Sequence, residues 1–596
     1  MEYKTRDEVP NEYKWDLSKM YHDNSEIEKD IQRVNDLTPK ILEFKSHIMD
    51  SSDSLYNFLK STEEQDRILT KLYVYSKMSF DVDTTDNKTK SLKMRIEKLS
   101  ESLNEKFSFI EPEMMESDYE TVLKYIEEND KLNEYKFYLE DIYRFKPHAL
   151  TQQEEDIYVR ALNAFGNCSE IFNNIDNTDI DLGYIKNEKG EEVKLTQSNY
   201  IVYMKSKNRS VRENAFNAMY NYFKNRKNTL ASTYVGQIKE SAFVTSVKKY
   251  NSSLERSLFN DNIDINVYKN LIDTVHKNMN LMYNYMDLRK KMLNLNELHM
   301  YDIYVDLVES DNDKVPFEEG KKILFEALKP LGEKYLTDLN KAFDEKWIDI
   351  YPSVGKRLGA YSWGCYDSYP YLLLNYNDTV DAVSTMGHEL GHSMHSYYSH
   401  RQNYVDSNYP IFLAEIASTV NEVLINDYMY KNAKTNEEKI FYLVDFLDTV
   451  RTTLYRQTMF AEFEMIMHKK EQDGIPLTEE EISNTYYELN KLYYGDNVVS
   501  DDNIRYEWSR IPHFYTPFYV YKYATGLSSA LSIASRILKG DTETRDNYLV
   551  FLSSGGNDYP LNILKKVGVD METPTPIEEA LSLFEEKLNE LKELIK

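Results

Sequence analysis

Residues Asp378 to Tyr398 read Asp-Thr-Val-Asp-Ala-Val-Ser-Thr-Met-Gly-His-Glu-Leu-Gly-His-Ser-Met-His-Ser-Tyr-Tyr, and their centre, His388 to His392, is an H-E-x-x-H motif. Residues four apart share one face of a helix, so both imidazoles can hold one metal ion while Glu389 points beside it. Asp378 or Thr379 can cap the helix. A buried stripe follows at helical spacing: Val380, Val383, Met386, Leu390 and Met394. The sequence therefore predicts a buried helix that carries a metal site.

A third protein ligand is expected, because a catalytic zinc ion keeps three side chains and one open position. Pro410 opens a second helical run, in which Glu415 stands among apolar residues and Glu422 follows two turns later on the same face. A carboxylate in a buried stripe is costly unless it is paired or bound to metal. We expect Glu415 to be the third ligand and Glu422 to orient a ligating histidine. His395 is expected to support the ligands in the same indirect way.

Composition excludes several other classes of protein. The net charge of −28 disfavours nucleic acid, because phosphate binding requires a basic surface. Cys168 and Cys365 give no disulfide pattern, and neither a signal peptide nor a run of about 18 apolar residues is found. We expect a cytoplasmic protein that is not bound to a membrane.

Length and composition predict a mainly helical body with more than one lobe. The chain has 596 residues, 41% hydrophobic and 29% charged, and only 18 Gly and 15 Pro interrupt it. Residues 1 to about 180 show apolar residues at helical spacing, and Ile180 to Gln197 then reads as a hairpin with Gly190 in the turn. We therefore expect an N-terminal helical lobe over residues 1–198 and a second domain, which carries the motif, over residues 199–596.

The residues around the motif resemble oligoendopeptidase F, in the thimet oligopeptidase family of zinc metallopeptidases. The resemblance extends over nearly the whole chain, through the following stretches: Asn11 to Leu17, Leu298 to Tyr304, His388 to His395, Phe412 to Thr419, Arg510 to Tyr515 and Tyr523 to Gly526. It implies a mostly helical body around a deep substrate channel, and the residues just before the zinc helix separately predict a small β-sheet beside it. It also implies an endopeptidase that cuts internal bonds of short, unstructured oligopeptides.

The expected mechanism uses one Zn²⁺ per chain, held by His388, His392 and Glu415, to activate water. Glu389 is the expected general base, and it can then deliver the proton to the leaving amine. The resemblance further implies that His513 and a nearby tyrosine stabilise the oxyanion.

The choice of tyrosine is open. The thimet branch has a glycine-rich spacer and a tyrosine five residues after the histidine, whereas Thr516 to Phe518 intervene here. The candidates are Tyr515, Tyr519 and Tyr521, of which we favour Tyr515 and Tyr521. The glutamates of Phe460 to Glu464, in the preceding helical region, are interpreted as surface or structural residues.

The strand Pro370 to Tyr376 leads into the zinc helix, and an unpaired edge there could bind an extended peptide; a plain buried strand is the equal alternative. Two other functions stay open. A zinc carboxypeptidase or dipeptidyl carboxypeptidase would need a cationic or backbone anchor for the C-terminal carboxylate close to the metal, and Arg505 and Arg510 are the nearest candidates in sequence. A non-catalytic peptide-binding protein would have no use for Glu389. The oligomeric state is left open.

Overall fold

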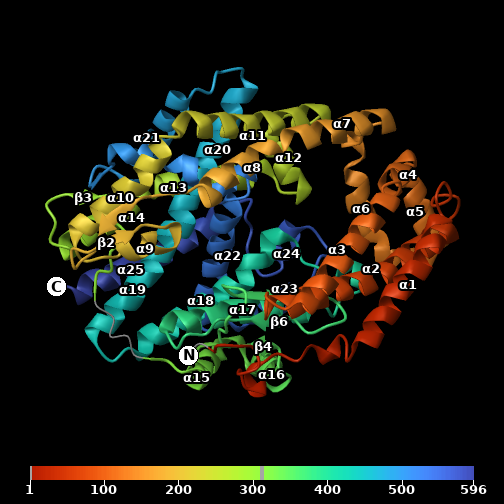
Figure 1. Ribbon diagram of the computed structural model, residues 1–596, viewed down its shortest axis with the longest axis horizontal. Coiled ribbons are helices and arrows are strands. Elements are labelled where there is room, and N and C mark those ends of the chain that lie inside the picture. The colour runs from red at the N-terminus through yellow and green to blue at the C-terminus, as the bar shows by residue number, and fades with distance from the viewer. Residues whose placement is uncertain (1–2, 309–313) are drawn as a thin grey trace. The chain divides into compact units, whose positions relative to one another are not determined.

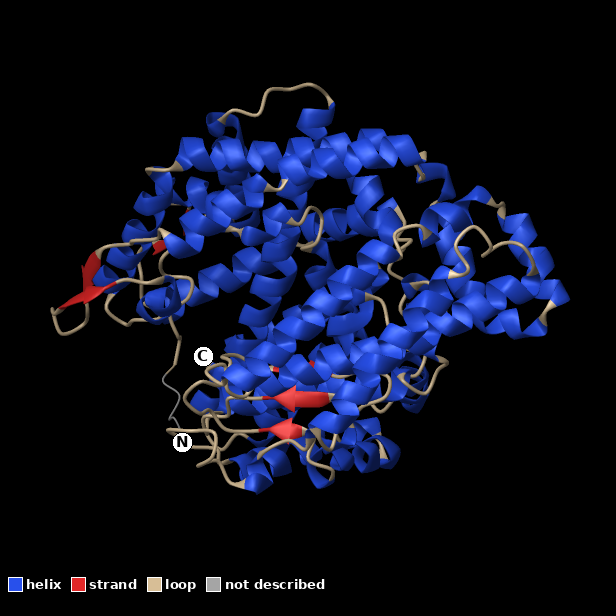
Figure 2. Ribbon diagram, turned by 45° about the vertical axis from the view of Figure 1, so that its right-hand side comes forward, coloured by secondary structure: helices blue, strands red, loops and turns tan. Residues whose placement is uncertain are grey.

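The computed structural model describes residues 3–308 and 314–596, and their fold is mainly helical with three small sheets (Figure 1). Figure 2 shows how few residues the strands take up beside the helices. The described residues form two compact units of three segments each: unit 1 from Met1–Ala149, Asn312–Tyr428 and Ile533–Gly568, and unit 2 from Leu150–Asp311, Met429–Ser532 and Val569–Lys596. The predicted fold class, mainly α with a small sheet, is confirmed.

Neither unit is one continuous stretch of chain. The first passage between them lies at Ala149 and Leu150, ahead of the boundary expected at residue 198. The expected hairpin is present as β1 (Tyr184–Lys186) and β2 (Glu192–Lys194), paired antiparallel within unit 2. The division into an N-terminal lobe over residues 1–198 and a catalytic domain over 199–596 stays a prediction.

Unit 1 contains α1 (Asn24–Leu42), α2 (Ser52–Asp81), α3 (Asn87–Lys106), α4 (Ile110–Glu116), α5 (Tyr119–Glu128), α6 (Lys136–Arg144), α15 (Phe317–Ala327), α16 (Glu333–Asp344), α17 (Val380–Ser399), α23 (Thr542–Leu552) and α24 (Pro560–Lys565), and α18 (Ile411–Asn432) begins in it. Its N-terminal helices share one hydrophobic core, in which Ile41, Leu55 and Val122 are fully buried. Burial of such side chains supplies the main driving force for packing amphipathic helices together.

A three-stranded sheet in unit 1 lies next to the motif helix. Its order is β4 (Ile348–Asp349), β6 (Tyr371–Leu373) and β5 (Tyr361–Trp363), with β4 parallel and β5 antiparallel to β6. All three residues of β6 are buried, and its two edges are both paired. The hypothesis of a free edge on this strand is therefore wrong. The backbone amides of Leu374 and Tyr376 are also used, since they donate to Asp349 and Ile350.

Unit 2 contains α7 (Gln152–Phe165), α8 (Asn167–Asn173), α9 (Gln197–Met204), α10 (Arg209–Lys224), α11 (Lys227–Val247), α12 (Ser253–Asn260), α13 (Ile265–Lys277), α14 (Met279–Met292), β3 (Leu298–His299), α19 (Asn436–Val450), α20 (Arg456–Gln472), α21 (Glu479–Tyr494), β7 (Val498–Val499) and α25 (Thr575–Leu594), and α22 (Tyr521–Leu538) begins in it. Two 3-10 helices, η9 (Asp502–Arg510) and η10 (Pro512–Tyr515), precede α22. Aromatic packing fixes η10: the ring centroid of Phe514 lies 5.2 Å from that of Phe463 and 5.7 Å from that of Tyr234. This packing anchors the segment that carries His513.

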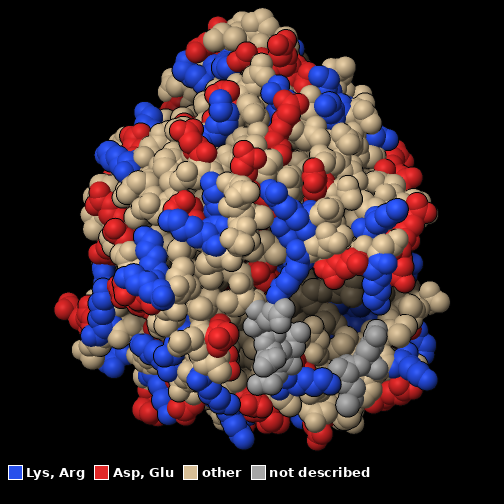
Figure 3. Space-filling model, turned by 90° about the vertical axis from the view of Figure 1, so that its left-hand side faces the viewer, with Lys and Arg blue, Asp and Glu red and all other residues tan. Residues whose placement is uncertain are grey.

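Charged side chains of both signs are mixed on one face of the molecule (Figure 3). On the face that Figure 3 shows, Lys and Arg are interspersed with Asp and Glu and do not gather into one basic area. That face thus offers no continuous basic surface for a phosphate backbone. Separately, none of the helices in residues 3–308 and 314–596 combines the length and apolar character that a membrane crossing requires.

Candidate active site

The motif helix α17 begins as its sequence predicts. Thr379 is the N-cap, and its side-chain oxygen accepts a hydrogen bond from the Ala382 amide at 3.1 Å. One side of the helix is buried, including Val383, Met386 and Leu390. The four-residue spacing then brings the Nε2 atoms of His388 and His392 to 3.2 Å from each other.

The third donor comes from α18, which lies beside α17 (Figure 1). Oε2 of Glu415 is 3.6 Å from Nε2 of His388 and 3.6 Å from Nε2 of His392. In a tetrahedral zinc site, with ligand bonds of about 2.0–2.1 Å, neighbouring ligand atoms lie about 3.3 Å apart. The three donor atoms are thus close to the spacing that such an ion requires. Two imidazoles and one carboxylate also form a donor set that leaves the fourth position open.

Gly391, inside the motif, sets the distance between the two helices. A Cβ atom at this position would lie 2.6 Å from the Ala417 carbonyl oxygen and 2.6 Å from Ser418 Cα. These are backbone atoms, which have no rotamer with which to move away. One turn earlier in α17, the Gly387 carbonyl accepts a hydrogen bond from the side-chain amide of Asn421, on α18, at 2.9 Å. The small residue and the buried amide together bring α18, and with it Glu415, up to α17.

Glu422 contacts one of the two histidines. Its Oε1 lies 3.0 Å from Nδ1 of His388. Burial alone lowers the pKa of His388, but the hydrogen bond and charge of Glu422 outweigh it and raise the pKa to about 8. A carboxylate on Nδ1 holds the proton there and leaves Nε2 as the ligand atom. For His392, burial and then the charge of His388 lower the pKa to about 3, which favours the neutral form that binds metal.

Glu389 lies in a different environment from the ligands. Glu389 is only 8% exposed. Burial raises the pKa of its carboxyl to about 7, and the charge of His388 offsets part of this shift. A hydrogen bond from the Ser362 backbone, on β5, lowers that pKa. A carboxyl with a pKa near neutrality is suited to proton transfer in both directions. Its role as the general base stays a prediction.

His395 does not contact the three donors through a hydrogen bond. Its ring is 1% exposed and stacks on Tyr409 at 3.6 Å between ring centroids. Nδ1 has no hydrogen-bond partner among the described residues, and burial lowers the pKa to about 3. The geometry thus gives His395 a packing role. Its expected support of the metal ligands stays a prediction.

His513, in unit 2, has Tyr523 as its neighbour. The Tyr523 hydroxyl lies 3.3 Å from Nε2 of His513, and the ring of Tyr519 lies 6.2 Å from the imidazole. The two tyrosines that we favoured point elsewhere. Tyr515 shares a hydrogen bond with the Thr233 hydroxyl at 2.7 Å, and Tyr521 is fully buried against Tyr268. The structure therefore pairs His513 with Tyr523, a residue that we did not select.

A buried carboxylate shapes this segment. Glu464 of α20 is fully buried, and its Oε1 accepts a hydrogen bond from the Phe518 amide at 3.0 Å. Phe518 has a φ of +60°, a left-handed conformation that is unusual for an aromatic residue. Burial raises the pKa of Glu464 well above its usual range, which favours the neutral form of its carboxyl group. Of the two alternatives left open for Glu464, surface or structural, the structure shows the structural one, since this bond helps to fix the turn between His513 and Tyr523.

These features define a class. A helical protein with two histidines of an H-E-x-x-H motif, a glutamate from the next helix and a free carboxyl beside them is a metallopeptidase of the H-E-x-x-H type. A model of peptidase family M3 matches residues 202–583, a model described as Oligopeptidase F matches residues 113–181, and the chain belongs to peptidase family M3.

Individual relatives agree along the full chain. Oligopeptidase PepF of Bacillus subtilis is 41% identical over 591 residues, covering 99% of this chain and 88% of its own. Group B oligopeptidase PepB of Streptococcus agalactiae is 39% identical over 596 residues, covering 99% and 98%. The crystal structure of oligoendopeptidase-F from Enterococcus faecium has a TM-score of 0.74 and 34% identity, covering 96% of this chain and 99% of that one. The resemblance to oligoendopeptidase F is confirmed, as is the assignment as a metalloendopeptidase.

Proposed function

We propose that this protein is a zinc-dependent endopeptidase that hydrolyses internal bonds of short, unstructured oligopeptides in the cytoplasm. The observation that carries the proposal is the convergence of Nε2 of His388, Nε2 of His392 and Oε2 of Glu415, which all lie within 4.8 Å of one another. Zinc is the metal that best suits two imidazoles and one carboxylate with a fourth, open position. We propose one ion per chain.

Zinc in this site supplies a Lewis acid that polarises the scissile carbonyl and makes water more acidic. Side chains of the protein carry out the proton transfers and orient the ligands. Glu389 accepts the proton of the attacking water and passes it to the amide nitrogen as the C–N bond breaks, leaving an amine and a carboxylate. Glu422 keeps the proton of His388 on Nδ1 throughout.

His513 and Tyr523 are proposed to donate hydrogen bonds to the oxyanion that develops on the carbonyl oxygen. Their own contact of 3.3 Å supports a joint role. Burial lowers the pKa of His513, so at neutral pH its imidazole donates as the neutral form. Tyr519, whose ring lies 5.4 Å from that of Tyr523, packs beside them.

An extended peptide is proposed to pair with β5, which lies at an edge of the sheet, because the central strand β6 is paired on both sides. No further strand pairs with β5 among the described residues. The Ser362 hydroxyl of β5 lies 2.8 Å from the Ser393 hydroxyl of α17, so this strand runs along the motif helix. A peptide must have a free backbone to pair with a strand edge, which restricts substrates to unstructured chains.

The test uses an end-blocked decapeptide and native casein, each incubated with and without a chelator. We expect cleavage of the blocked peptide at internal bonds, loss of activity with chelator, recovery with Zn²⁺, and an intact casein chain. Mass spectrometry of the products identifies the bonds. Cleavage only of peptides with a free C-terminus would instead indicate the alternative, a carboxypeptidase or dipeptidyl carboxypeptidase. Rapid digestion of native casein would contradict the restriction to oligopeptides.

A further inference from the structure

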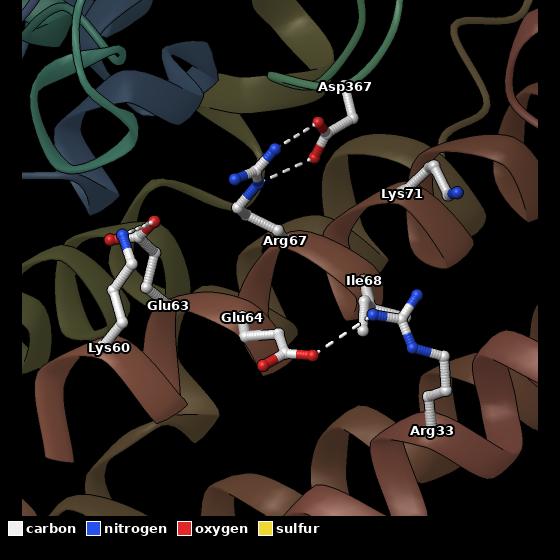
Figure 4. Close-up of a pocket in the computed structure, with 8 residues that line it drawn as sticks. All are labelled: Arg33, Lys60, Glu63, Glu64, Arg67, Ile68, Lys71 and Asp367. Carbon is white, nitrogen blue, oxygen red and sulfur yellow. Dashed lines mark hydrogen bonds and ion pairs between the residues drawn. The ribbon is translucent and has the colours of Figure 1, made fainter. Parts of the chain in front are cut away.

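Charged groups that are withdrawn from water are usually paired. A pocket of about 440 Å³ in unit 1 is lined by charged side chains of both signs, which Figure 4 shows turned toward one another. Arg67 binds Asp367 at 2.6 Å, Arg33 binds Glu64 at 3.2 Å and Lys60 binds Glu63 at 2.9 Å. Because these cations already have partners, the pocket does not require an anion.

Unit 2 contains a departure from the rule. Three carboxylates there each face two guanidinium groups: Asp302 with Arg209 and Arg212, Asp448 with Arg289 and Arg451, and Glu507 with Arg456 and Arg510. Five of these six arginines hydrogen-bond their carboxylate, at 2.5–3.0 Å. Arg510 is the exception. Its closest approach to Glu507 is 4.0 Å, and it makes no hydrogen bond with the described residues.

Glu507 has little capacity left for Arg510. Its Oε1 accepts from Arg456 at 2.5 Å and from the Tyr220 hydroxyl at 3.1 Å, and its Oε2 accepts from the Tyr486 hydroxyl. One carboxylate therefore faces two cations. The Asp176 carboxyl also interacts electrostatically with Arg510 but makes no hydrogen bond with it, so the donors of Arg510 lack an acceptor among the described residues.

Aromatic rings surround the unsatisfied guanidinium. It lies 5.5 Å from the ring centroid of Tyr200 and 6.0 Å from that of Tyr220. The Arg510 side chain is 25% exposed, so solvent or a ligand can reach it. In such apolar surroundings a hydrogen bond to a charged partner is stronger than in water. A planar guanidinium matches the two oxygens of a carboxylate.

We propose that Arg510 binds a carboxylate of the peptide substrate, either its C-terminus or an acidic side chain. The proposal rests on the proposed function and adds a specificity residue to it. Arg510 ends η9 and lies three residues before His513 of η10, so the two side chains come from consecutive turns of the same segment. A local cation is needed because the net charge of −28 repels anionic peptides at long range.

Arg505 offers a matched control. It belongs to the same 3-10 helix, and its side chain is 26% exposed, but it is paired with Asp502 at 2.8 Å and with Asn484 at 3.2 Å. Arg510→Gln, Arg510→Lys and Arg505→Gln are compared with the wild-type holoenzyme. The substrates are N-acetylated peptides of neutral residues, either with a free C-terminus or amidated. A third set of N-acetylated peptides has an amidated C-terminus and carries either Glu or Gln at one internal position, which is varied from peptide to peptide.

For the Arg510→Gln enzyme we expect KM to rise roughly 10- to 100-fold for peptides that carry the bound carboxylate, and by less than about 3-fold for their amide or Gln counterparts. A KM effect confined to the peptides with a free C-terminus would identify the C-terminal carboxylate as the bound group, and an effect confined to the Glu peptides would identify an acidic side chain. Arg505→Gln should leave both kinds of peptide unchanged. Arg510→Lys keeps the charge without the planar fork and should lie in between, and it replaces the Gln variant if that one does not fold.

Two other results would distinguish a failure of the Arg510 proposal from a failure of the proposed peptidase function. Equal KM changes for charged and neutral peptides, or no change, would overturn the carboxylate proposal while cleavage itself still supports the peptidase. If the wild-type enzyme cleaves none of these peptides, the proposed function is wrong.

Discussion

Nδ1 of His388 lies 3.0 Å from Oε1 of Glu422, which stands two turns along α18 from the proposed ligand Glu415. One helix thus carries both a carboxylate of the proposed metal site and the carboxylate that contacts a histidine of the other helix. The two glutamates are on the same face because seven residues complete about two turns. Their contributions can be separated by substitution.

Glu422→Ala should keep the site but weaken metal binding or activity by roughly 10- to 100-fold, because His388 loses the partner that fixes its tautomer. Glu415→Ala removes a ligand atom and should leave little metal after dialysis. Metal analysis and competition with a chelator measure both effects. Full zinc occupancy in the Glu415 variant would assign the third ligand to another residue.

Glu389→Gln should bind metal normally and lose most peptidase activity, by roughly 10²- to 10⁴-fold in kcat. The amide keeps the shape of the side chain but accepts no proton at neutral pH. Steady-state kinetics, together with zinc content and circular dichroism, check the prediction. A variant with near wild-type kcat would exclude Glu389 as the general base.

The site could be predicted from sequence where local geometry decides it. A helix fixes the four-residue spacing of His388 and His392, and a carboxylate within an apolar run singled out Glu415. The structure was needed for the rest. A short apolar strand has the same sequence pattern at the centre or at the edge of a sheet, so the central place of β6 was not predictable.

The tyrosine beside His513 could not be predicted for a similar reason. Side-chain directions after a turn depend on its backbone, and Phe518 adopts a φ of +60° that aromatic residues rarely show. The hydrogen bond from its amide to Glu464 joins residues 54 positions apart. No periodicity in the sequence signals such a contact, so neither this bond nor the place of Tyr523 beside His513 could be predicted.

Substitutions around His513 should follow the observed contacts. His513→Ala should lower kcat roughly 10²- to 10³-fold with a smaller change in KM, because an oxyanion donor acts in the transition state. Tyr523→Phe should also act mainly on kcat. Tyr515→Phe and Tyr521→Phe are the matched controls and should leave kcat within a few-fold of wild type. Activity lost in a control but kept in Tyr523→Phe would reverse the assignment.

Gly391→Ala should impair the metal site although alanine is the better helix former. The new methyl group meets the backbone of α18 at Ala417 and Ser418, so the helices must move apart and withdraw Glu415. Overpacking of this kind costs about 1–3 kcal/mol or more. Gly387→Ala is the control: its methyl group meets the end of the Ile425 side chain, which can rotate. Zinc affinity should fall in the first variant and change less in the second.

Asp406 predicts a pH dependence of stability in unit 1. Burial, and then the charge of Glu134, raise the pKa of its carboxyl to about 6, above an ordinary value of about 3.9. The folded state therefore binds this proton more tightly than the unfolded chain, and the stabilisation present below about pH 4 is lost as the pH rises to 6. Asp406→Asn should raise the melting temperature at pH 7.5 relative to wild type, with the difference shrinking toward pH 4. Glu134→Gln should reduce the pH dependence without removing it. Thermal unfolding of the three proteins across this range gives the comparison, and parallel curves for wild type and Asp406→Asn would show that the carboxyl is not the group responsible.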